Sequence, residues 1–232
     1  MAGRVLVVGD IHGCRRELDV LLGALATGAG DTLVFLGDYV DRGPDVRGVV
    51  ERLVELAARP GPRTVFLRGN HEDMMLGYLG RGGRYGEAFL VNGGDVTVRS
   101  YGVRGRPSPE RLESALPAEH LAFLLSTTLM HVEGDYVMVH AGVRPDRPLD
   151  AQRPHDLLWI RDEFIAHPHD LGKTVVFGHT PRREVLADLP YKVGIDTGCV
   201  YGGMLTALEL PSLTIHAVRL GSGKVERRPL VA

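Results

Sequence analysis

The fold class can be inferred from a short stretch near the start of the sequence, Val5-Leu6-Val7-Val8-Gly9-Asp10-Ile11-His12-Gly13. Its four leading apolar residues predict a short buried strand, and the Gly-Asp pair predicts a sharp turn at the carboxyl end of that strand. The same order recurs at 32–36, which runs into Gly37-Asp38, and at 64–67, which precedes Arg68-Gly69-Asn70. The chain is therefore expected to begin with three similar strands that each end in a polar turn.

Helical patterns fill the gaps between these strands. Leucines that recur at i, i+3, i+4 and i+7 predict an amphipathic helix over 15–26. A second helix is expected after Pro44, which suits a first turn, and a short third one after residue 71. Strands that alternate with helices at this spacing predict right-handed crossovers and a parallel sheet.

The rest of the chain has a different character. Residues 80–110 are rich in Gly and Arg and predict a variable insertion, and a helical pattern over 110–126 is interrupted at Pro117. Further strands are predicted at 128–133, 135–140, 174–178, 191–195, 204–210 and 213–219. We expect one domain over 1–232, of mixed α/β class, with two facing β-sheets flanked by helices.

Composition excludes several classes of protein. The chain has 232 residues, and Lys+Arg 27 against Asp+Glu 29 gives a net charge of −2, so neither nucleic acid nor an anionic membrane is expected as the main partner. No apolar run approaches the roughly 20 residues that span a bilayer. The residues before the first strand do not form a signal peptide, so a cytoplasmic location is expected.

The two cysteines do not form a disulfide framework or a thiolate metal site. Both Cys14 and Cys199 are predicted to be small buried apolar side chains. Cys14 directly follows the first polar turn, which suggests the hypothesis that its oxidation would perturb the site formed there.

Five polar segments follow apolar runs at the expected strand ends. They are GDIHG (9–13), GDYVDRG (37–43), RGNHE (68–72), HAG (140–142) and GHT (178–180). A single segment of this kind is typical of a turn, a helix cap or a hydrogen-bonded core histidine. Five of them at strand ends instead predict one shared site, because ligands of open α/β sheets bind beyond the carboxyl ends of the strands.

The side chains in these segments are those that bind metals. Carboxylate, amide and imidazole groups occur together without a thiolate, a mixture that suits Mn, Fe or Zn better than Ca. Six candidate ligands are too many for one tetrahedral centre and suit two adjacent metals that share a bridging carboxylate. The candidate ligands are Asp10, His12, Asp38, Asn70, His140 and His179.

These motifs and their order resemble the phosphoprotein-phosphatase type of the calcineurin-like metallophosphoesterases. Asn92-Gly93-Gly94, Trp159 to Phe164 and Asp196-Thr197-Gly198 resemble in particular the compact bacterial and phage serine/threonine phosphatases. The resemblance implies the calcineurin-like fold, with the metal site at the carboxyl ends of the strands. The chain lacks the longer C-terminal part of the eukaryotic enzymes, so no regulatory subunit is implied.

The resemblance also implies a ligand set. Metal one would take Asp10, His12 and the bridging Asp38, and metal two would take Asp38 together with Asn70, His140 and His179. The cofactors would be two divalent metal ions, manganese first, with iron or zinc as alternatives. A hydroxide that bridges the metals would attack phosphorus directly.

Four more residues receive roles from the same resemblance. His71 would be the general acid that protonates the leaving alkoxide, and Asp41 would orient His71. Arg42 and Arg161, with Asn70, would bind the substrate phosphate, since a guanidinium forms paired charge-assisted bonds to phosphate oxygens.

The sequence leaves three functions open. The first is a phosphatase that acts on phosphoserine or phosphothreonine in phosphoprotein or phosphopeptide substrates. The second is a symmetrical dinucleoside polyphosphate hydrolase with the same dimetal core, and the third is a metal-binding regulatory protein without catalysis. The choice of substrate is assigned to the segments 80–110 and 143–170.

The remaining histidines are expected to lie outside the site. Those in polar or proline-containing stretches are predicted to be solvated, and those in strand patterns are predicted to be structural. The first group is His120, His155, His167 and His169, and the second is His131 and His216.

Overall fold

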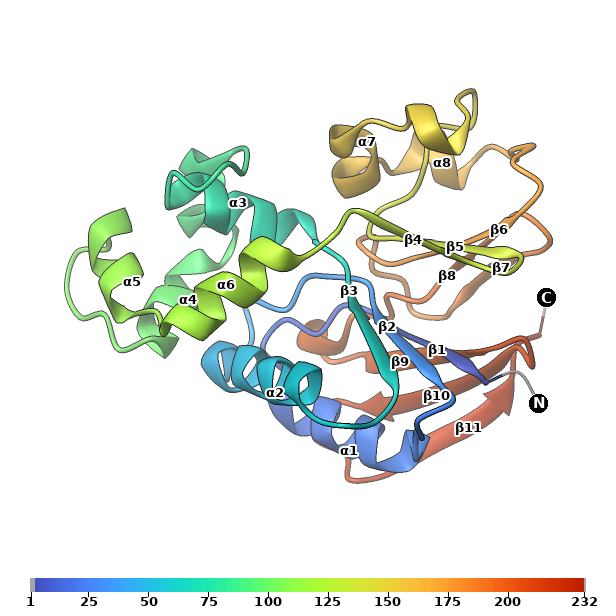
Figure 1. Cartoon of the computed structure of the whole chain (residues 1–232), viewed down its shortest axis with the longest axis horizontal. Coiled ribbons are helices and arrows are strands. Elements are labelled where there is room, and N and C mark those ends of the chain that lie inside the picture. The colour runs from blue at the N-terminus through green and yellow to red at the C-terminus, as the bar shows by residue number, and fades with distance from the viewer. Residues whose placement is uncertain (1–2, 232) are drawn as a thin grey trace.

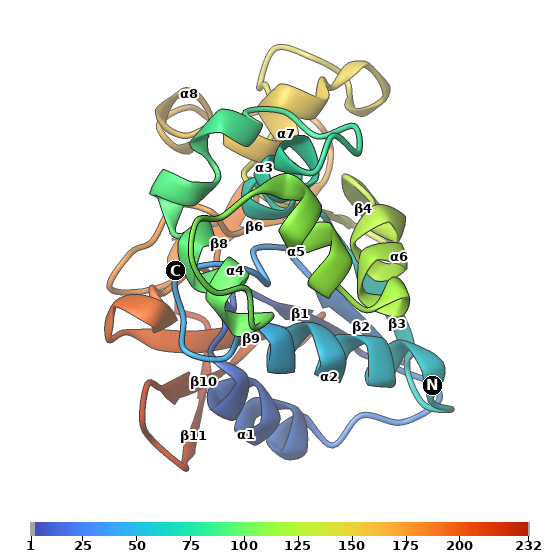
Figure 2. The same cartoon turned by 90° about the vertical axis from the view of Figure 1, so that its left-hand side faces the viewer.

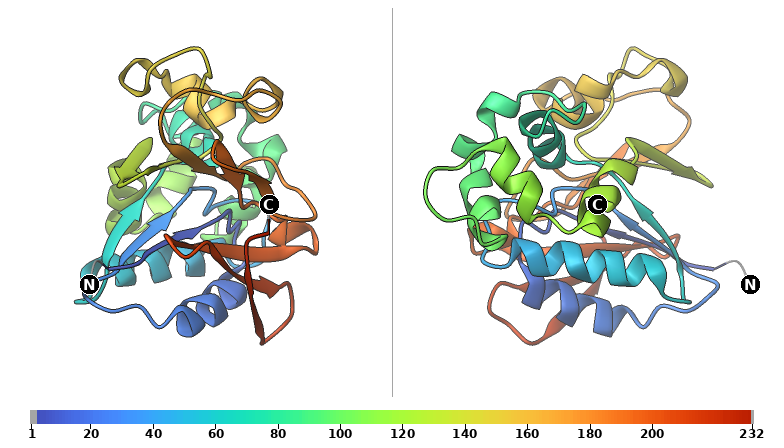
Figure 3. Two further views of the ribbon diagram at one scale, coloured as in Figure 1. Left: turned by 90° about the vertical axis from the view of Figure 1, so that its right-hand side faces the viewer. Right: turned by 60° about the vertical axis from the view of Figure 1, so that its left-hand side comes forward.

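Two mixed β-sheets face each other, and helices cover their outer faces and one end (Figure 1). The computed structural model describes residues 3–231, and Met1, Ala2 and Ala232 lie outside the described residues. The left view of Figure 3 shows one sheet above the other. The predicted α/β class with two facing sheets flanked by helices is confirmed.

The first sheet has six strands in the order β11-β10-β9-β1-β2-β3. Its three N-terminal strands run parallel and in register, so that Val7 pairs with Val34 and Val34 pairs with Val65. Two helices make the crossovers predicted from the sequence. These elements are β1 (Val5–Val8), α1 (Arg15–Leu25), β2 (Thr32–Phe35), α2 (Val46–Ala58) and β3 (Arg63–Phe66).

The C-terminal strands extend this sheet on the other side of β1. They are antiparallel to their neighbours, and β9 pairs with β1 while β10 pairs with β9 and β11. Their bounds are β9 (Met204–Leu210), β10 (Thr214–Arg219) and β11 (Val225–Pro229). The sequence pattern did not predict β11.

The second sheet has five strands in the order β4-β5-β6-β8-β7. A hairpin turn at Gly134 joins the first two strands, and β5, β6 and β8 then run parallel. Their bounds are β4 (Met130–Glu133), β5 (Tyr136–Val139), β6 (Thr174–Phe177), β7 (Leu186–Asp188) and β8 (Lys192–Gly194). The short edge strand β7 was not predicted.

Helices between β3 and β4 form the end of the molecule seen in Figure 2. The segment predicted as an insertion holds two short 3₁₀ turns and one helix, and Pro117 separates two helices as expected. These elements are α3 (Asn70–Tyr78), η1 (Gly86–Ala88), η2 (Leu90–Asn92), α4 (Gly94–Ser100), α5 (Pro109–Ala115) and α6 (Ala118–Ser126).

Three apolar cores hold the layers together. The core between the sheets includes Val7 and Val34 from one sheet and Val176 and Val193 from the other. A second core lies between the first sheet and α1, α2 and the end helices. A third lies beneath α7 (Pro154–Trp159) and α8 (Asp162–Ile165), which cover the second sheet. The opposed sheets bring the carboxyl ends of strands from both halves of the chain to one place.

Among residues 3–231, no helix combines the length and the apolar character that crossing a bilayer requires.

Candidate active site

The backbone at the strand ends is bent into the left-handed region. His12, Asp38 and His179 have φ values of 43°, 52° and 64°, and Asp41 and Arg42 follow with 73° and 69°. Such conformations cost about 1–3 kcal/mol each in a residue other than glycine. The surrounding fold therefore stabilises these turns against their local preference, and the turns direct polar side chains into one space.

Gly37 shows how closely these turns approach one another. Its φ is 106°, and a Cβ at this position would lie 2.4 Å from the backbone nitrogen of Gly69. Only glycine permits the turn after β2 to touch the turn after β3. That contact brings Asp38 and Asn70 together.

Asp38 lies at the centre of the candidate site. Its Oδ2 is 3.3 Å from His12 Nε2 and 4.0 Å from His71 Nε2, and its Oδ1 is 3.4 Å from His140 Nε2. Two groups of potential ligands thus share this carboxylate, one with His12 and His71 and the other with His140 and His179. Asp38 occupies the position that a bridging carboxylate requires.

Asn70 and Asp10 complete the set of predicted ligands. Asn70 Oδ1 is 3.0 Å from His140 Nε2 and 2.9 Å from His179 Nδ1. Asp10 accepts the backbone N–H of His179 at 3.0 Å through Oδ2. All six predicted metal ligands are buried, and the structure brings them to one location.

The histidines present lone pairs toward this centre. His12 Nδ1 is 2.8 Å from the Val40 carbonyl, and His140 Nδ1 is 2.9 Å from the Leu36 carbonyl, so each Nδ1 carries the proton in the neutral ring. Burial lowers the pKa of His140 and lowers that of His179 well below the usual range. Neutral imidazoles are the form that binds metals.

Several acceptor atoms near Asp38 have no hydrogen-bond donor. The Nε2 lone pair of neutral His140 faces the oxygens of Asn70 and Asp38, and His179 Nε2 is buried without a hydrogen-bond partner among the described residues. Burial and the charges of Asp196 and Asp38 raise the pKa of Asp10 well above its usual value. A concentration of carboxylate oxygen, amide oxygen and imidazole nitrogen of this kind fits divalent cations, and it fits them at two adjoining positions.

His71 forms a hydrogen-bonded pair with Asp41. Its Nδ1 lies 2.6 Å from Asp41 Oδ2, and both side chains are almost wholly buried. Thr97, from α4, donates its hydroxyl to Asp41 Oδ1 at 2.5 Å and accepts the Asp41 backbone N–H at 3.0 Å. These contacts fix the carboxylate and direct His71 Nε2 toward Asp38.

The two predicted phosphate-binding arginines lie at the edge of the site. Arg42 donates to His12 Nε2 at 2.6 Å, and its guanidinium carbon is 5.6 Å from the centre of the Tyr201 ring. Arg161 is exposed at the start of α8, and its positive charge is one of the causes that lower the pKa of His179. Arg42 therefore contacts a candidate ligand directly, and the charge of Arg161 acts on His179, so both cations remain candidates for binding a phosphate group.

Glu72 is a residue to which the sequence alone gave no role. It is fully buried, and its two carboxylate oxygens accept the backbone N–H groups of Asp38, Tyr39, Val40 and Gly69 at 2.8–3.1 Å. This one side chain thereby holds the turn after β2 against the start of α3. Its place in the segment RGNHE was the available signal, because an acid at the third position of a helix can satisfy N–H groups at the helix start.

Asp196 is a second such residue. It comes two residues after the end of β8, and it is buried beside the site. Burial raises its pKa to about 6. The Gly198 N–H donates to its Oδ1 at 3.0 Å, which ties the carboxylate to its own loop.

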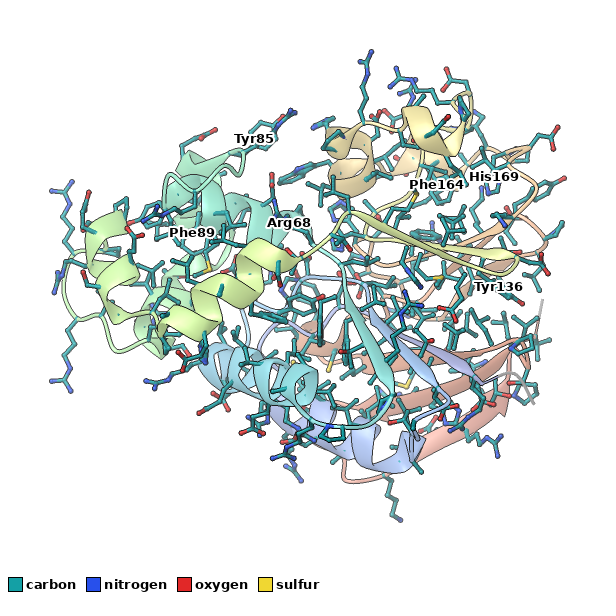
Figure 4. The ribbon with its side chains drawn as sticks, viewed as in Figure 1. Arg68, Tyr85, Phe89, Tyr136, Phe164 and His169 are labelled. Atoms are coloured by element: carbon teal, nitrogen blue, oxygen red, sulfur yellow. The ribbon has the colours of Figure 1, made fainter. Side chains whose placement is uncertain are left out.

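The segments expected to choose the substrate meet beside the site. Tyr85, from the 80–110 segment, lies 5.3 Å ring to ring from Trp159 at the end of α7, and Trp159 lies 6.2 Å from the ring of His179. Figure 4 shows Tyr85 on the side of its segment that faces α7. These aromatic rings form a wall between the two segments, next to the candidate ligands.

The two cysteines and two of the remaining histidines lie in the packed interior. Cys14 and Cys199 are buried as predicted, and their thiols lie within 4.8 Å of each other and of the Glu17 carboxylate. His120 and His169 are buried rather than solvated, so that prediction was wrong. The reason is local packing, because Tyr101 contacts His120 and the Phe164 ring stacks on His169 (Figure 4).

Comparison with known proteins identifies the family. The model of the calcineurin-like phosphoesterases matches residues 3–207. The chain belongs to this family. The resemblance drawn from the motifs is confirmed, and the chain is a phosphoesterase hydrolase of a family that uses a dimetal site.

The relatives include more than one kind of phosphoesterase. Serine/threonine-protein phosphatase 1 of Salmonella typhimurium is 33% identical over 210 residues, which cover 87% of this chain and 89% of that protein. The asymmetrical bis(5'-nucleosyl)-tetraphosphatase PrpE of Anoxybacillus flavithermus is 28% identical over 91% of this chain and 92% of its own length. A crystal structure provisionally assigned as a diadenosine tetraphosphatase has a TM-score of 0.68 at 28% identity, with 95% of each chain covered.

Proposed function

We propose that this phosphoesterase hydrolyses phosphoserine and phosphothreonine monoesters in proteins. The observation that carries the proposal is the buried His71–Asp41 pair, which holds an imidazole 4.0 Å from the carboxylate of Asp38. A serine or threonine alkoxide is a very poor leaving group and needs a proton as the P–O bond breaks. The phosphate chain released from a dinucleoside polyphosphate needs much less help.

The roles of the other residues follow from their positions. Asp10, His12, Asp38, Asn70, His140 and His179 would hold two divalent cations, for which manganese remains the first candidate and iron or zinc the alternatives. Such cations, when bound, lower the pKa of water and neutralise charge on the phosphate. Arg42, Arg161 and Asn70 would bind the phosphate oxygens, and His71 would donate the proton from Nε2 while Asp41 holds Nδ1.

A substitution at His71 tests the proposal. His71→Asn should lower kcat on a phosphoserine peptide by about 10²–10⁴-fold, the usual contribution of a general acid. The loss should be much smaller on p-nitrophenyl phosphate, since its phenolate leaves without a proton. Metal content measured on the same samples separates loss of the acid from loss of the metals. An equal loss on both substrates at full metal content would contradict the proposed role.

The activity for which PrpE is named supports a second candidate, the hydrolysis of dinucleoside polyphosphates by the same centre. Phosphoserine peptide and diadenosine tetraphosphate should be assayed side by side at several metal concentrations. A clearly higher kcat/KM on the nucleotide would reverse our order of preference. Absence of turnover on p-nitrophenyl phosphate with manganese would instead favour the non-catalytic alternative. We also propose that the protein is located in the cytoplasm.

A further inference from the structure

A basic groove opens directly beside the candidate site. It has a volume of about 510 Å³ and is formed by the loop that follows His179 and the loop that follows Asp196. Its lining includes Arg182, Arg183, Glu184, Tyr201 and Arg219.

The groove and the site share one wall. Pro181, which lines the groove, comes two residues after His179, and Gly198, which also lines it, comes two residues after Asp196. Tyr201 also lines the groove, and its ring centre lies 5.6 Å from the guanidinium carbon of Arg42, which in turn reaches His12. A substrate whose phosphate is bound by Arg42 would therefore extend past Tyr201 into the groove.

The charge of the groove is unbalanced. Arg182, Arg183 and Arg219 are exposed, and none of them forms an ion pair or a side-chain hydrogen bond with another residue in 3–231. The one acidic side chain in the lining, Glu184, instead accepts from Arg228 at 3.1 Å. Three free guanidinium groups thus point to a ligand with carboxylate or phosphate groups.

From this arrangement we infer that the groove binds acidic residues that flank the phosphorylated side chain of a protein substrate. This inference rests on the proposed function and names its substrate class. A nucleotide is the less favoured occupant, because Arg42 already covers one face of Tyr201 and the other described residues of the lining include no aromatic ring on which a base could stack. The open, exposed lining suits an extended polypeptide.

Matched phosphoserine peptides test the inference. The acidic peptides carry aspartates either before or after the phosphoserine. The neutral peptides carry asparagines at the same positions. We expect the wild-type protein to prefer an acidic series by about tenfold in kcat/KM, mainly through KM, and we expect added salt to reduce that preference.

A triple variant separates the groove from the catalytic centre. Arg182→Gln, Arg183→Gln and Arg219→Gln together should remove the preference while the rate on p-nitrophenyl phosphate stays the same. The matched control, Arg104→Gln, Arg106→Gln and Arg227→Gln, removes the same charge from exposed positions outside the groove and should keep the preference.

Three other results would overturn either the groove inference or the proposed function. Equal hydrolysis of acidic and neutral peptides by the wild-type protein would overturn the groove inference and leave the proposed function intact. Turnover of p-nitrophenyl phosphate without turnover of any phosphopeptide would overturn the proposed function itself. Loss of diadenosine tetraphosphate hydrolysis in the triple variant, with peptide preference unchanged, would assign the groove to a nucleotide and overturn the inference.

Discussion

At the scale of single residues, the site depends on side chains outside the set of candidate ligands. Thr97 is the clearest case, since its hydroxyl fixes the carboxylate that holds His71. Thr97→Val keeps the size of the side chain and removes both hydrogen bonds. We expect kcat on phosphoserine peptide to fall by about 10–100-fold, as for other residues that orient a functional side chain.

The effect of Thr97→Val should depend on the substrate. The loss of kcat should be small on p-nitrophenyl phosphate, because Thr97 acts through the proton donor and not on the phosphate. Thr64→Val, on β3 and without a side-chain hydrogen bond among the described residues, is the control. Equal losses on the two substrates would show that Thr97 matters only for folding.

Asp31 directly precedes β2 and forms an ion pair with Arg4, outside the candidate site. Hydrogen bonds from the Arg4 side chain lower the pKa of Asp31 to about 2. The unfolded carboxyl has a pKa near 3.9, so the stabilisation is present above about pH 4 and is lost as the pH falls toward 2. Because Arg4 is partly exposed, we expect this interaction to contribute only about 1 kcal/mol to the free energy of unfolding.

Urea denaturation between pH 6 and pH 3 measures this effect. The difference in unfolding free energy between the wild-type protein and Asp31→Asn should shrink as the pH falls. Asp150→Asn, an exposed position, serves as the reference for changes in net charge. A difference that stays constant across the range would contradict the assignment.

The six candidate ligands and the His71–Asp41 pair could be singled out at this scale because they lie in short motifs at strand ends. Thr97 could not be assigned, since it contacts Asp41 from a helix 56 positions further along the chain. Glu72 lies inside a motif whose helix-start position predicts its bond to the Gly69 N–H, but its bonds to the N–H groups of residues 38–40 could not be predicted. Contacts of this kind depend on packing between segments that only the folded chain brings together.

At the scale of elements, Lys192 on β8 secures the end of α8. It is fully buried, and its Nζ donates to the carbonyls of Phe164, Ile165 and His167 at 2.6–3.2 Å. These are carbonyls at the end of a helix, which would otherwise lack partners. Lys192→Met should lower the free energy of unfolding by about 2–3 kcal/mol, the usual contribution of hydrogen bonds to a charged group.

Urea denaturation at neutral pH provides the measurement for Lys192. Lys224→Met, at an exposed position, should change the unfolding free energy by less than about 0.5 kcal/mol. A Lys192 variant as stable as the wild-type protein would show that water replaces the ammonium group at these carbonyls.

Most elements were predictable from their apolar periods, and the exceptions have physical reasons. The strand β7 has only three residues, too few for a period to appear. The edge strand β11 reads VERRP, and its charged residues suit an exposed edge but hide the strand pattern. The buried strands β1, β2 and β6 were recognised because both of their faces are covered.

At the scale of the whole molecule, the candidate ligands come from both sheets. Asp10 and Asp38 follow strands of the first sheet, and His140 and His179 follow strands of the second. Metal binding should therefore stabilise the packing of the two halves. With manganese at about 100 times its Kd, linkage gives about 2.7 kcal/mol, which corresponds to a rise in Tm of roughly 5–10 °C for a domain of this size.

Asp38→Asn tests this linkage. The variant should lose most of both metals and most of the metal-induced rise in Tm, because the shared carboxylate belongs to both groups of ligands. Elemental analysis and thermal unfolding with and without manganese measure the two effects. Glu226→Gln, on β11, should behave like the wild-type protein. Full occupancy in Asp38→Asn would exclude the bridging role.

The left-handed backbone at His12, Asp38, Asp41, Arg42 and His179 has a consequence for the engineering of this protein. Glycine adopts such conformations without penalty, so these positions are among those where a change to glycine relieves local strain. Each such change would also delete a side chain that the chemistry needs. In the absence of metal, a gain in stability at these positions would thus be accompanied by a loss of turnover, so variants selected for heat resistance under such conditions should also be screened for activity.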